Sequence, residues 1–330
     1  MPSVLKVAGL EVKPGKRGKK LAKVGEVTDG TEVNLPFIVV NGAKDGPTFV
    51  LRGGEHGSEF TGQEAVRQVS LQVNPEELSG AIIAIPNCNP LAYRDGTYKN
   101  FRVYDITAGN PIDYTTRDSN GAFDQRVSNV IWEEALSKAD VSLTMHDGAA
   151  HWMTRYIANV RFTDGMKELG ERTLAIAKAF GVGYPIFHKK VPAFTGADAE
   201  LAERGVPTMT PEVGGMGVLW KSDLDRGVKG ITNVMKYLKM IEGQPEPSDQ
   251  IIFEEEVRVR CNRGGFMKPA ISLMDIPLIV EKGQILCSIT NLLGEELEAI
   301  ESPCRGVVFN ARSTSSVYTG DWLYGLGKIS

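Results

Sequence analysis

The strongest constraint on the fold is an alternation of two apolar patterns between about residue 32 and residue 241. Short continuous apolar runs, which indicate buried strands, occur at 37–40, 48–51, 81–85, 141–144 and 206–210. Apolar residues recur at helical spacing from about 58 to 73, 127 to 137, 165 to 180 and 222 to 240. Strands that alternate with helices predict an α/β layer architecture.

The two ends of the chain have a different character. Residues 242–250 contain two prolines and lack apolar residues, which marks a boundary. Residues 251–330 contain short, alternating apolar runs separated by glycines, a pattern typical of a compact all-β domain. Residues 1–31 are basic and rich in glycine, and we expect a β segment packed with that β domain, with the basic run 13–20 as a solvated turn. The predicted parts are therefore 1–31, 32–241 and 251–330.

Composition narrows the class of protein. A formal net charge of -4 offers no broad cationic surface for nucleic acid or for an anionic membrane. No apolar run approaches the roughly 20 residues that span a bilayer, and the N-terminus lacks the apolar core of a signal peptide. The 4 cysteines are scattered without a disulfide pattern. We expect a cytoplasmic protein that acts on a small molecule. Formation of a homo-oligomer is possible.

Two metal-ligating residue types follow the strand-like run that ends near residue 52. In Gly53-Gly-Glu-His-Gly-Ser-Glu59, His56 and Glu59 are three residues apart across a predicted strand-to-helix turn. Both side chains are ordinary zinc ligands, and a catalytic zinc needs a third protein ligand. His146 directly follows the strand 141–144, so it also lies at the end of a strand. In an α/β sheet such ends form one edge, where ligand sites gather.

A carboxylate suited to acid–base chemistry follows a further strand. Glu212 lies after the run 206–210, flanked by glycines in Pro211-Glu-Val-Gly-Gly215. It would act as general base toward a water that the metal activates, and then as general acid to a leaving nitrogen. His56, Glu59, His146 and Glu212 together predict a metal-dependent hydrolase.

At these motifs the sequence resembles the succinylglutamate desuccinylase/aspartoacylase family of zinc-dependent deacylases. His-Gly-Ser-Glu59 is similar to its H-G-x-E motif, the segment at His146 to its third zinc ligand, and Pro-Glu212-Val-Gly-Gly to its catalytic glutamate. Pro86-Asn-Cys-Asn-Pro90, which contains Asn89, resembles a segment that borders the active site. The resemblance implies a zinc carboxypeptidase-like α/β/α domain with a mixed sheet, a C-terminal all-β domain, and one Zn²⁺ per chain.

One position departs from the family pattern. The family's D-L-N-R-x-F segment is here Asp118-Ser-Asn-Gly-Ala-Phe123, so Gly121 stands where an arginine helps to hold the substrate. A guanidinium binds a carboxylate with two parallel hydrogen bonds, and glycine offers only a backbone amide. Asn120 remains to orient a carbonyl. The candidates for the missing charge are Arg117, Arg102 and Arg155, with Arg94 and Arg126 as further options, and each has the alternative of an ordinary surface arginine.

Further residues near the motifs have two interpretations each. Asp147 either orients a ligand or is a turn residue before Gly148, and the turn is favoured. Trp152 and Tyr156 either line an acyl pocket or lie in the core. The C-terminal β domain either narrows the mouth of the site or mediates oligomerisation.

The expected reaction is hydrolysis of the amide of an N-acyl amino acid or a related small N-acyl amine. Three alternatives stay open: a metallocarboxypeptidase, a hydrolase of other amides or esters, and a binding protein on an inactive scaffold.

Overall fold

The computed structural model describes residues 2–99 and 116–329, and it has the predicted mixed α/β class. Its helices are α1 (Phe60–Gln72), α2 (Pro90–Asp95), α3 (Phe123–Glu134), α4 (Lys167–Phe180), α5 (Ala197–Glu203) and α6 (Lys221–Tyr237). The strands up to residue 215 are β1 (Leu5–Val7), β2 (Leu10–Val12), β3 (Lys16–Glu26), β4 (Glu32–Asn41), β5 (Lys44–Gly53), β6 (Ser79–Ile85), β7 (Val141–Met145), β8 (Trp152–Phe162), β9 (Ile186–Lys190) and β10 (Thr208–Gly215). The later strands are β11 (Ile252–Phe253), β12 (Glu256–Arg260), β13 (Gly265–Pro269), β14 (Leu278–Val280), β15 (Ile285–Thr290), β16 (Glu296–Glu301), β17 (Gly306–Arg312), β18 (Ser316–Val317) and β19 (Trp322–Lys328).

One mixed sheet of 13 strands organises the molecule, with the order β12-β19-β17-β8-β10-β7-β5-β6-β4-β3 along its main path. β9 pairs with β8 and β11, and β14 pairs with β17. The central strands β10, β7, β5 and β6 are parallel to one another, and β4 and β8 run antiparallel to their neighbours in that group.

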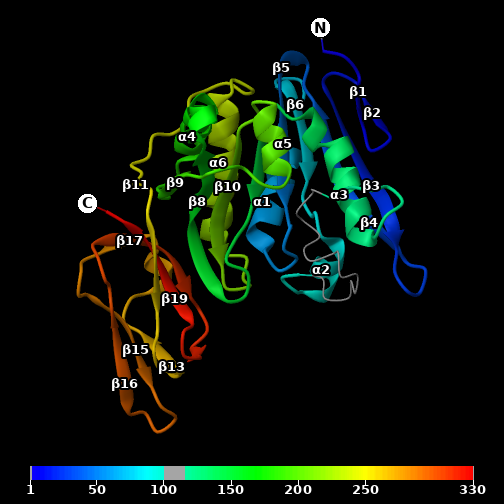
Figure 1. The fold of residues 1–330 in the computed structure, drawn as a ribbon. Coiled ribbons are helices and arrows are strands. Elements are labelled where there is room, and N and C mark those ends of the chain that lie inside the picture. The colour runs from blue at the N-terminus through cyan, green and yellow to red at the C-terminus, as the bar shows by residue number, and fades with distance from the viewer. Residues whose placement is uncertain (1, 100–115, 330) are drawn as a thin grey trace.

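Helices cover both faces of the central sheet (Figure 1). Side chains alternate between the two faces of a strand, so the apolar run 81–85 supplies two cores. Ile82 and Ala84 pack with α1, α4 and α6, whereas Ile83 and Ile85 pack with α3 and α5. Burial on both faces explains why these strands read as continuous apolar runs in the sequence.

The N-terminal segment packs differently from the expectation. β3 forms a hairpin with β4 at the edge of the large sheet opposite β12, and Val7 and Val12 join the core beneath α3. Figure 1 shows the β1–β2 hairpin on the far side of the molecule from β13, β15 and β16. The segment therefore packs on the α/β layers and not with the C-terminal β region, because a short turn connects β3 to β4. The basic run 13–20 is partly strand, since β3 begins at Lys16.

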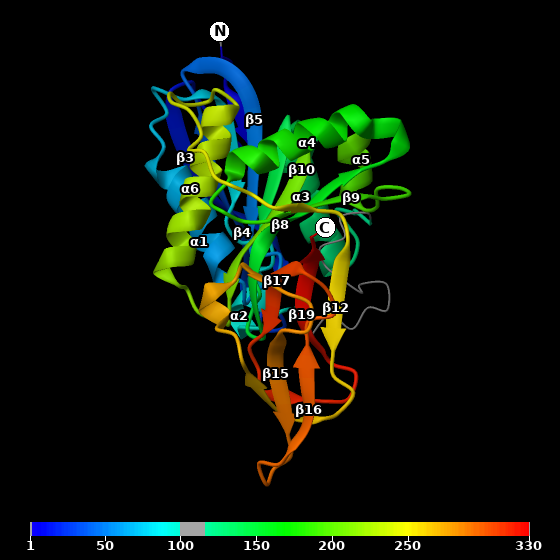
Figure 2. The ribbon, with the colours of Figure 1, turned by 90° about the vertical axis from the view of Figure 1, so that its left-hand side faces the viewer.

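The C-terminal region contains strands and one short 3₁₀ helix, in agreement with the all-β prediction. β16, β15, β13 and β18 form a separate antiparallel sheet, whereas β12, β19 and β17 extend the large sheet through the β17–β8 pairing. Figure 2 shows β17, β19 and β12 between the α/β layers and the β15–β16 pair. Residues 242–250 form neither helix nor strand. Within the described residues, no helix is both long and apolar enough to cross a membrane.

Candidate active site

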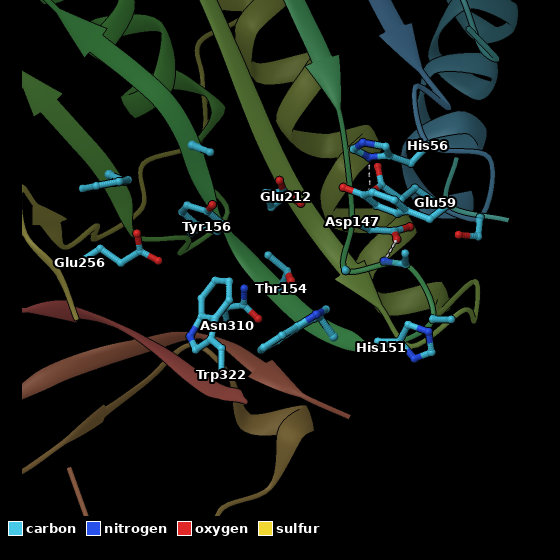
Figure 3. A pocket seen from close by; sticks show the side chains of 18 of the residues that line it. His56, Glu59, Asp147, His151, Thr154, Tyr156, Glu212, Glu256, Asn310 and Trp322 are labelled. Atoms are coloured by element: carbon cyan, nitrogen blue, oxygen red, sulfur yellow. Dashed lines mark hydrogen bonds and ion pairs between the residues drawn. The ribbon is translucent and has the colours of Figure 1, made fainter. Parts of the chain in front are cut away.

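Three neighbouring parallel strands bring the predicted ligands and base to one edge of the large sheet. β5 leads into the loop that carries His56 and Glu59, β7 ends directly before His146, and β10 contains Glu212. An isolated bridge between His146 and Glu212 continues the β7–β10 pairing. Figure 3 shows His56, Glu59 and Glu212 facing one hollow. The parallel register therefore gathers residues that lie far apart in the sequence.

The loop after β5 depends on close packing that only glycine permits. A Cβ on Gly57 would lie 2.1 Å from the carbonyl carbon of Ala92, so a larger residue would push α2 away. Asn89 joins the same two segments from the N-cap of α2. Its Nδ2 donates to the carbonyl of Glu55 at 3.2 Å, and its Oδ1 accepts from the amide of Ala92 at 3.2 Å. Asn89 therefore holds the ligand loop in place and does not line the cavity described below.

The three predicted ligands converge on one point. His56 Nδ1 lies 2.7 Å from Glu59 Oε1, His146 Nδ1 lies 2.8 Å from Glu59 Oε2, and the two Nδ1 atoms are 3.2 Å apart. Glu59 is buried, and its Oε2 has no hydrogen bond of acceptable geometry despite the short distance to His146. Two histidines and one glutamate form the donor set of known catalytic metal sites. His56, Glu59 and His146 therefore fit a metal ion.

Glu55 supports the third ligand from behind. Its Oε2 lies 3.2 Å from His146 Nε2, and its Oε1 accepts a hydrogen bond from Arg52 Nη1. Burial opposes the charge on Glu55, but the Arg52 guanidinium and the contact with His146 hold the pKa of this carboxyl well below its usual range. A carboxylate on the outer ring nitrogen fixes the orientation of a ligating imidazole. The sequence analysis assigned Glu55 no role, although it stands directly before His56.

Replacing Glu55 with glutamine is expected to weaken metal binding about 10- to 100-fold, because an amide holds the His146 ring less firmly than a carboxylate does. The affinity can be measured by titrating the metal-free protein against a fluorescent zinc chelator. Glu64→Gln, at the partly exposed Glu64 of α1 that pairs with Arg67, is the matched control and should bind metal like the wild type. Equal affinities for Glu55→Gln and wild type would remove Glu55 from the site.

Asp147 is a turn and cap residue beside the ligands. Its Oδ2 accepts from the amide of Thr61 at 3.0 Å, at the N-terminus of α1, and its Oδ1 accepts from the amide of Ala149 at 2.8 Å. Burial, with a further contribution from the charge of Glu59, raises the pKa of Asp147 to about 7. These contacts agree with the favoured turn interpretation. The same contacts tie the chain after His146 to the helix that follows Glu59.

Glu212 lies within β10, opposite Tyr156 of β8, and does not follow the strand as expected. The strand continues past it because β8 pairs with residues 210–215. Burial raises the pKa of Glu212 to about 8; His146 lowers it, and the carboxylates Glu59 and Asp147 raise it. Glu212 is outside the group of convergent ligand atoms but faces the same cavity. That placement suits a group that exchanges protons with the substrate.

The site opens into a cavity of about 980 Å³. β8 supplies one wall through alternate residues, Trp152, Thr154, Tyr156 and Ala158. Trp152 and Tyr156, whose position the sequence left open, are therefore cavity residues. Near the ligands, the Tyr98 ring stacks on His56 with ring centroids 3.7 Å apart.

The C-terminal β region forms the opposite part of the cavity. Its contributions are Glu256 and Arg258 from β12, Asn310 from β17 and Trp322 from β19. Figure 3 shows Asn310 and Trp322 across the hollow from His56 and Glu59. The region thus narrows the mouth of the site. None of these four residues was among the sequence candidates, because the separation along the chain hides the β17–β8 pairing that joins them to the sheet.

Arg155 is not available to hold a substrate. Its guanidinium is buried, with Nε 2.8 Å from Asp223 Oδ1 and Nη2 2.9 Å from Asp223 Oδ2. Its Nη1 donates to the carbonyls of Met274 and Ile276 at 2.7 and 2.6 Å. Successive side chains of a strand point to opposite faces of the sheet, so Arg155 points away from the face of β8 that carries Thr154 and Tyr156.

The remaining substrate candidates lie outside the cavity or outside the described residues. Arg117 pairs with Glu200 at 2.8 Å and stacks over Trp132 with its Cζ 4.0 Å from the ring centroid. Asn120 is exposed, and its carbonyl accepts from Arg126 Nη2 at 3.0 Å. Neither Arg117 nor Asn120 lines the cavity. Arg102 falls in the segment 100–115, which the structure does not describe.

Comparison with known proteins covers the part of the chain that carries these residues. The family model described as the succinylglutamate desuccinylase/aspartoacylase catalytic domain matches residues 45–238, more than half of the chain. This range includes His56, Glu59, His146 and Glu212. Among curated proteins, N-alpha-acetyl-L-2,4-diaminobutyric acid deacetylase of Halomonas elongata is 24% identical over 304 residues, which cover 90% of this chain and 86% of the relative.

Solved structures show the same fold at low identity. The crystal structure of a succinylglutamate desuccinylase/aspartoacylase from Rhodobacter sphaeroides superposes with a TM-score of 0.80 at 23% identity, covering 97% of this chain and 98% of that one. The product-bound ectoine utilization protein EutE (DoeB) of Ruegeria pomeroyi superposes with a TM-score of 0.81 at 19% identity, covering 100% of both chains. The similarity therefore extends through the C-terminal β region.

Proposed function

Since the chain belongs to the succinylglutamate desuccinylase/aspartoacylase family, we propose that it is a zinc-dependent deacylase of an N-acyl amino acid or a related small N-acyl amine. The observation that carries the proposal is the convergence of His56, Glu59 and His146 on one point beside Glu212, within one cavity. The relative from Halomonas elongata is a deacetylase of N-alpha-acetyl-L-2,4-diaminobutyric acid, which supports an acylated amine as the substrate.

Zinc suits the site because two imidazole nitrogens and one carboxylate are its usual catalytic ligands. When bound, it would polarise the scissile carbonyl and lower the pKa of water.

Glu212 would perform the proton transfers of the reaction. Its carboxylate accepts a proton from the attacking water and later donates that proton to the departing nitrogen. Burial, which raises the pKa of Glu212, also favours its protonated form at the second step. Glu55 and Asp147 keep His146 and the start of α1 in position. Trp152 and Tyr156 in the cavity wall would offer aromatic surface to the apolar part of the substrate.

The test is a substrate screen with controlled metal content. The protein is stripped with a chelator, reloaded with zinc, and assayed against N-acyl amino acids, acylated diamines and short peptides. We expect the zinc-loaded protein to hydrolyse N-acyl compounds. The stripped protein should lose at least about 90% of this activity, because a bound metal stabilises the transition state by several kcal/mol. One equivalent of zinc should restore the activity. Cleavage of peptides alone would identify a metallocarboxypeptidase, and failure to take up zinc would identify a binding protein.

We also propose a cytoplasmic location. None of the 4 cysteines, all of which lie in the described residues, forms a disulfide, and Cys88, Cys261 and Cys287 are buried. Free buried thiols are typical of a reducing compartment, where they act as small apolar side chains. Detection of a disulfide in protein isolated from its native host would contradict this assignment.

A further inference from the structure

The cavity extends well beyond the metal ligands along one face of the large sheet. The strands under it follow the order β10, β8, β17, β19 and β12. Neighbouring strands lie about 4.8 Å apart, so β17 lies roughly 10 Å and β12 roughly 19 Å from the strand of Glu212. A volume of about 980 Å³ is at the upper end for a small-molecule site. An N-acyl amino acid whose carboxylate lies directly beside the scissile amide at Glu212 would leave the β12 end unfilled.

Asn310 is an unpaired polar group on the floor of this extension. It is only 8% exposed, yet it lines the cavity, and its Oδ1 has no hydrogen-bond partner. It lies in register with Thr154 on β8 and Gly325 on β19. Buried amides are normally hydrogen-bonded, and an amide can serve as donor and as acceptor. The Asn310 amide therefore has hydrogen-bonding capacity that no described residue uses, on a side chain that borders the cavity.

Two opposite charges stand at the far end on β12. Arg258 Nε lies 3.1 Å from Glu256 Oε1 and its Nη2 lies 3.3 Å from Glu256 Oε2. The guanidinium also stacks on Trp322, with Cζ 4.5 Å from the ring centroid. Among the described contacts, this pair uses two of the five N–H donors of Arg258, and the Glu256 carboxylate can accept further hydrogen bonds. The stacked Arg258 guanidinium and the Glu256 carboxylate therefore present one positive and one negative charge in fixed positions. This arrangement complements a ligand that carries both a positive and a negative charge.

We propose that Asn310, Glu256 and Arg258 form a distal subsite for a zwitterionic amino-acid head. The substrate is then a diamino acid acylated on its side-chain amine, with the acyl amide at Glu212 and the free α-amino and α-carboxyl groups at β12. This inference rests on the proposed deacylase function and names its substrate class. Trp152 and Trp322, with ring centroids 4.7 Å apart, form an apolar wall for the methylene chain between the two ends.

Three matched substrates test the subsite. Nε-acetyl-L-lysine carries the complete zwitterion, N-acetylcadaverine lacks the carboxylate, and 6-acetamidohexanoate lacks the ammonium group. The zinc-loaded wild type is expected to show at least a tenfold higher kcat/KM for Nε-acetyl-L-lysine than for either analogue, because each charged hydrogen bond contributes about a factor of ten. It should also prefer this compound to Nα-acetyl-L-lysine, whose carboxylate lies beside the scissile amide.

Two charge-removing variants should give a crossed pattern. Glu256→Gln is expected to lower kcat/KM about tenfold for the two substrates with an ammonium group and to leave 6-acetamidohexanoate unchanged. Arg258→Gln should lower it for the two substrates with a carboxylate and leave N-acetylcadaverine unchanged. Asn310→Leu should raise KM for all three with little effect on kcat. For Glu256→Gln and Arg258→Gln, a purely structural role would instead change kcat/KM equally for all three substrates.

Arg260→Gln is the matched control, since Arg260 lies on β12 outside the cavity and donates to the carbonyl of Gly320. Calorimetric binding of L-lysine gives a readout that does not depend on turnover, and Glu256→Gln should weaken it about tenfold. Equal losses on all three substrates in Glu256→Gln and Arg258→Gln, a preference for Nα-acetyl-L-lysine, or unchanged lysine binding in Glu256→Gln would each overturn the subsite. If no N-acyl compound is hydrolysed, the deacylase function fails, and lysine binding alone decides the subsite.

Discussion

Glu212→Gln is expected to lower kcat for an N-acyl substrate by between about 10² and 10⁴-fold, with the bound zinc retained. An amide cannot accept the proton of the attacking water or return it to the leaving nitrogen. The carboxylate is outside the ligand group of His56, Glu59 and His146, so the metal should remain. The shape of the side chain is unchanged, and a neutral amide is easier to bury in β10 than a charged carboxylate.

The measurement combines single-turnover kinetics with metal analysis of the same sample. Glu168→Gln, on the exposed start of α4, is the control for a general effect of removing a carboxylate. Glu212→Asp keeps the acid but withdraws it from the cavity, and should retain more activity than the glutamine variant. Near-normal kcat in Glu212→Gln with zinc bound would assign the proton transfers to another group. Loss of zinc would instead make Glu212 part of the metal site.

The convergence of His56, Glu59 and His146 could be predicted from the sequence because it depends on local order. His56, Glu59 and His146 each follow an apolar run, and buried parallel strands are recognised from such runs. Once two strands are parallel neighbours, the residues after them share an edge. The position of Glu212 was harder to predict from the sequence. Glu212 lies inside β10, because pairing with β8 extends this strand beyond its apolar part.

The cavity beyond the ligands could not be predicted, because it depends on pairings between distant segments. β8 was not recognised as a strand, although Trp152, Thr154, Tyr156 and Ala158 share one face and Met153, Arg155 and Ile157 the other. Asn310 and Glu256 enter the site only through the pairing of β17 with β8 and of β12 with β19. The packing of residues 1–31 was predicted wrongly for a similar reason. The turn that pairs β3 with β4 cannot be recognised from composition.

The second large effect is expected when Arg155 is replaced, and it concerns the stability of the fold. Arg155→Met is expected to lower the free energy of unfolding by about 3–5 kcal/mol, because it removes the main partner of the buried Asp223 carboxylate. That carboxylate then keeps the longer contact with Arg226 Nη1 at 3.6 Å and the Tyr184 hydroxyl at 3.3 Å. Two carbonyls that Arg155 holds, those of Met274 and Ile276, would also lose their donor. These contacts join β8 and α6 to the chain that leads into the C-terminal β region. Urea denaturation followed by tryptophan fluorescence gives the value.

The double variant Arg155→Met/Asp223→Asn separates the lost ion pair from the lost volume. Asparagine removes the buried charge and can still accept the hydrogen bond from the Tyr184 hydroxyl, which lies 3.3 Å from Asp223 Oδ1. It should therefore recover most of the stability, since a buried charge without its main partner is the main penalty. A substrate role for Arg155 predicts the reverse pattern, with normal stability and a raised KM that the second substitution does not relieve. The two roles are distinguishable because Arg155 and the cavity residues Thr154 and Tyr156 lie on opposite faces of one strand.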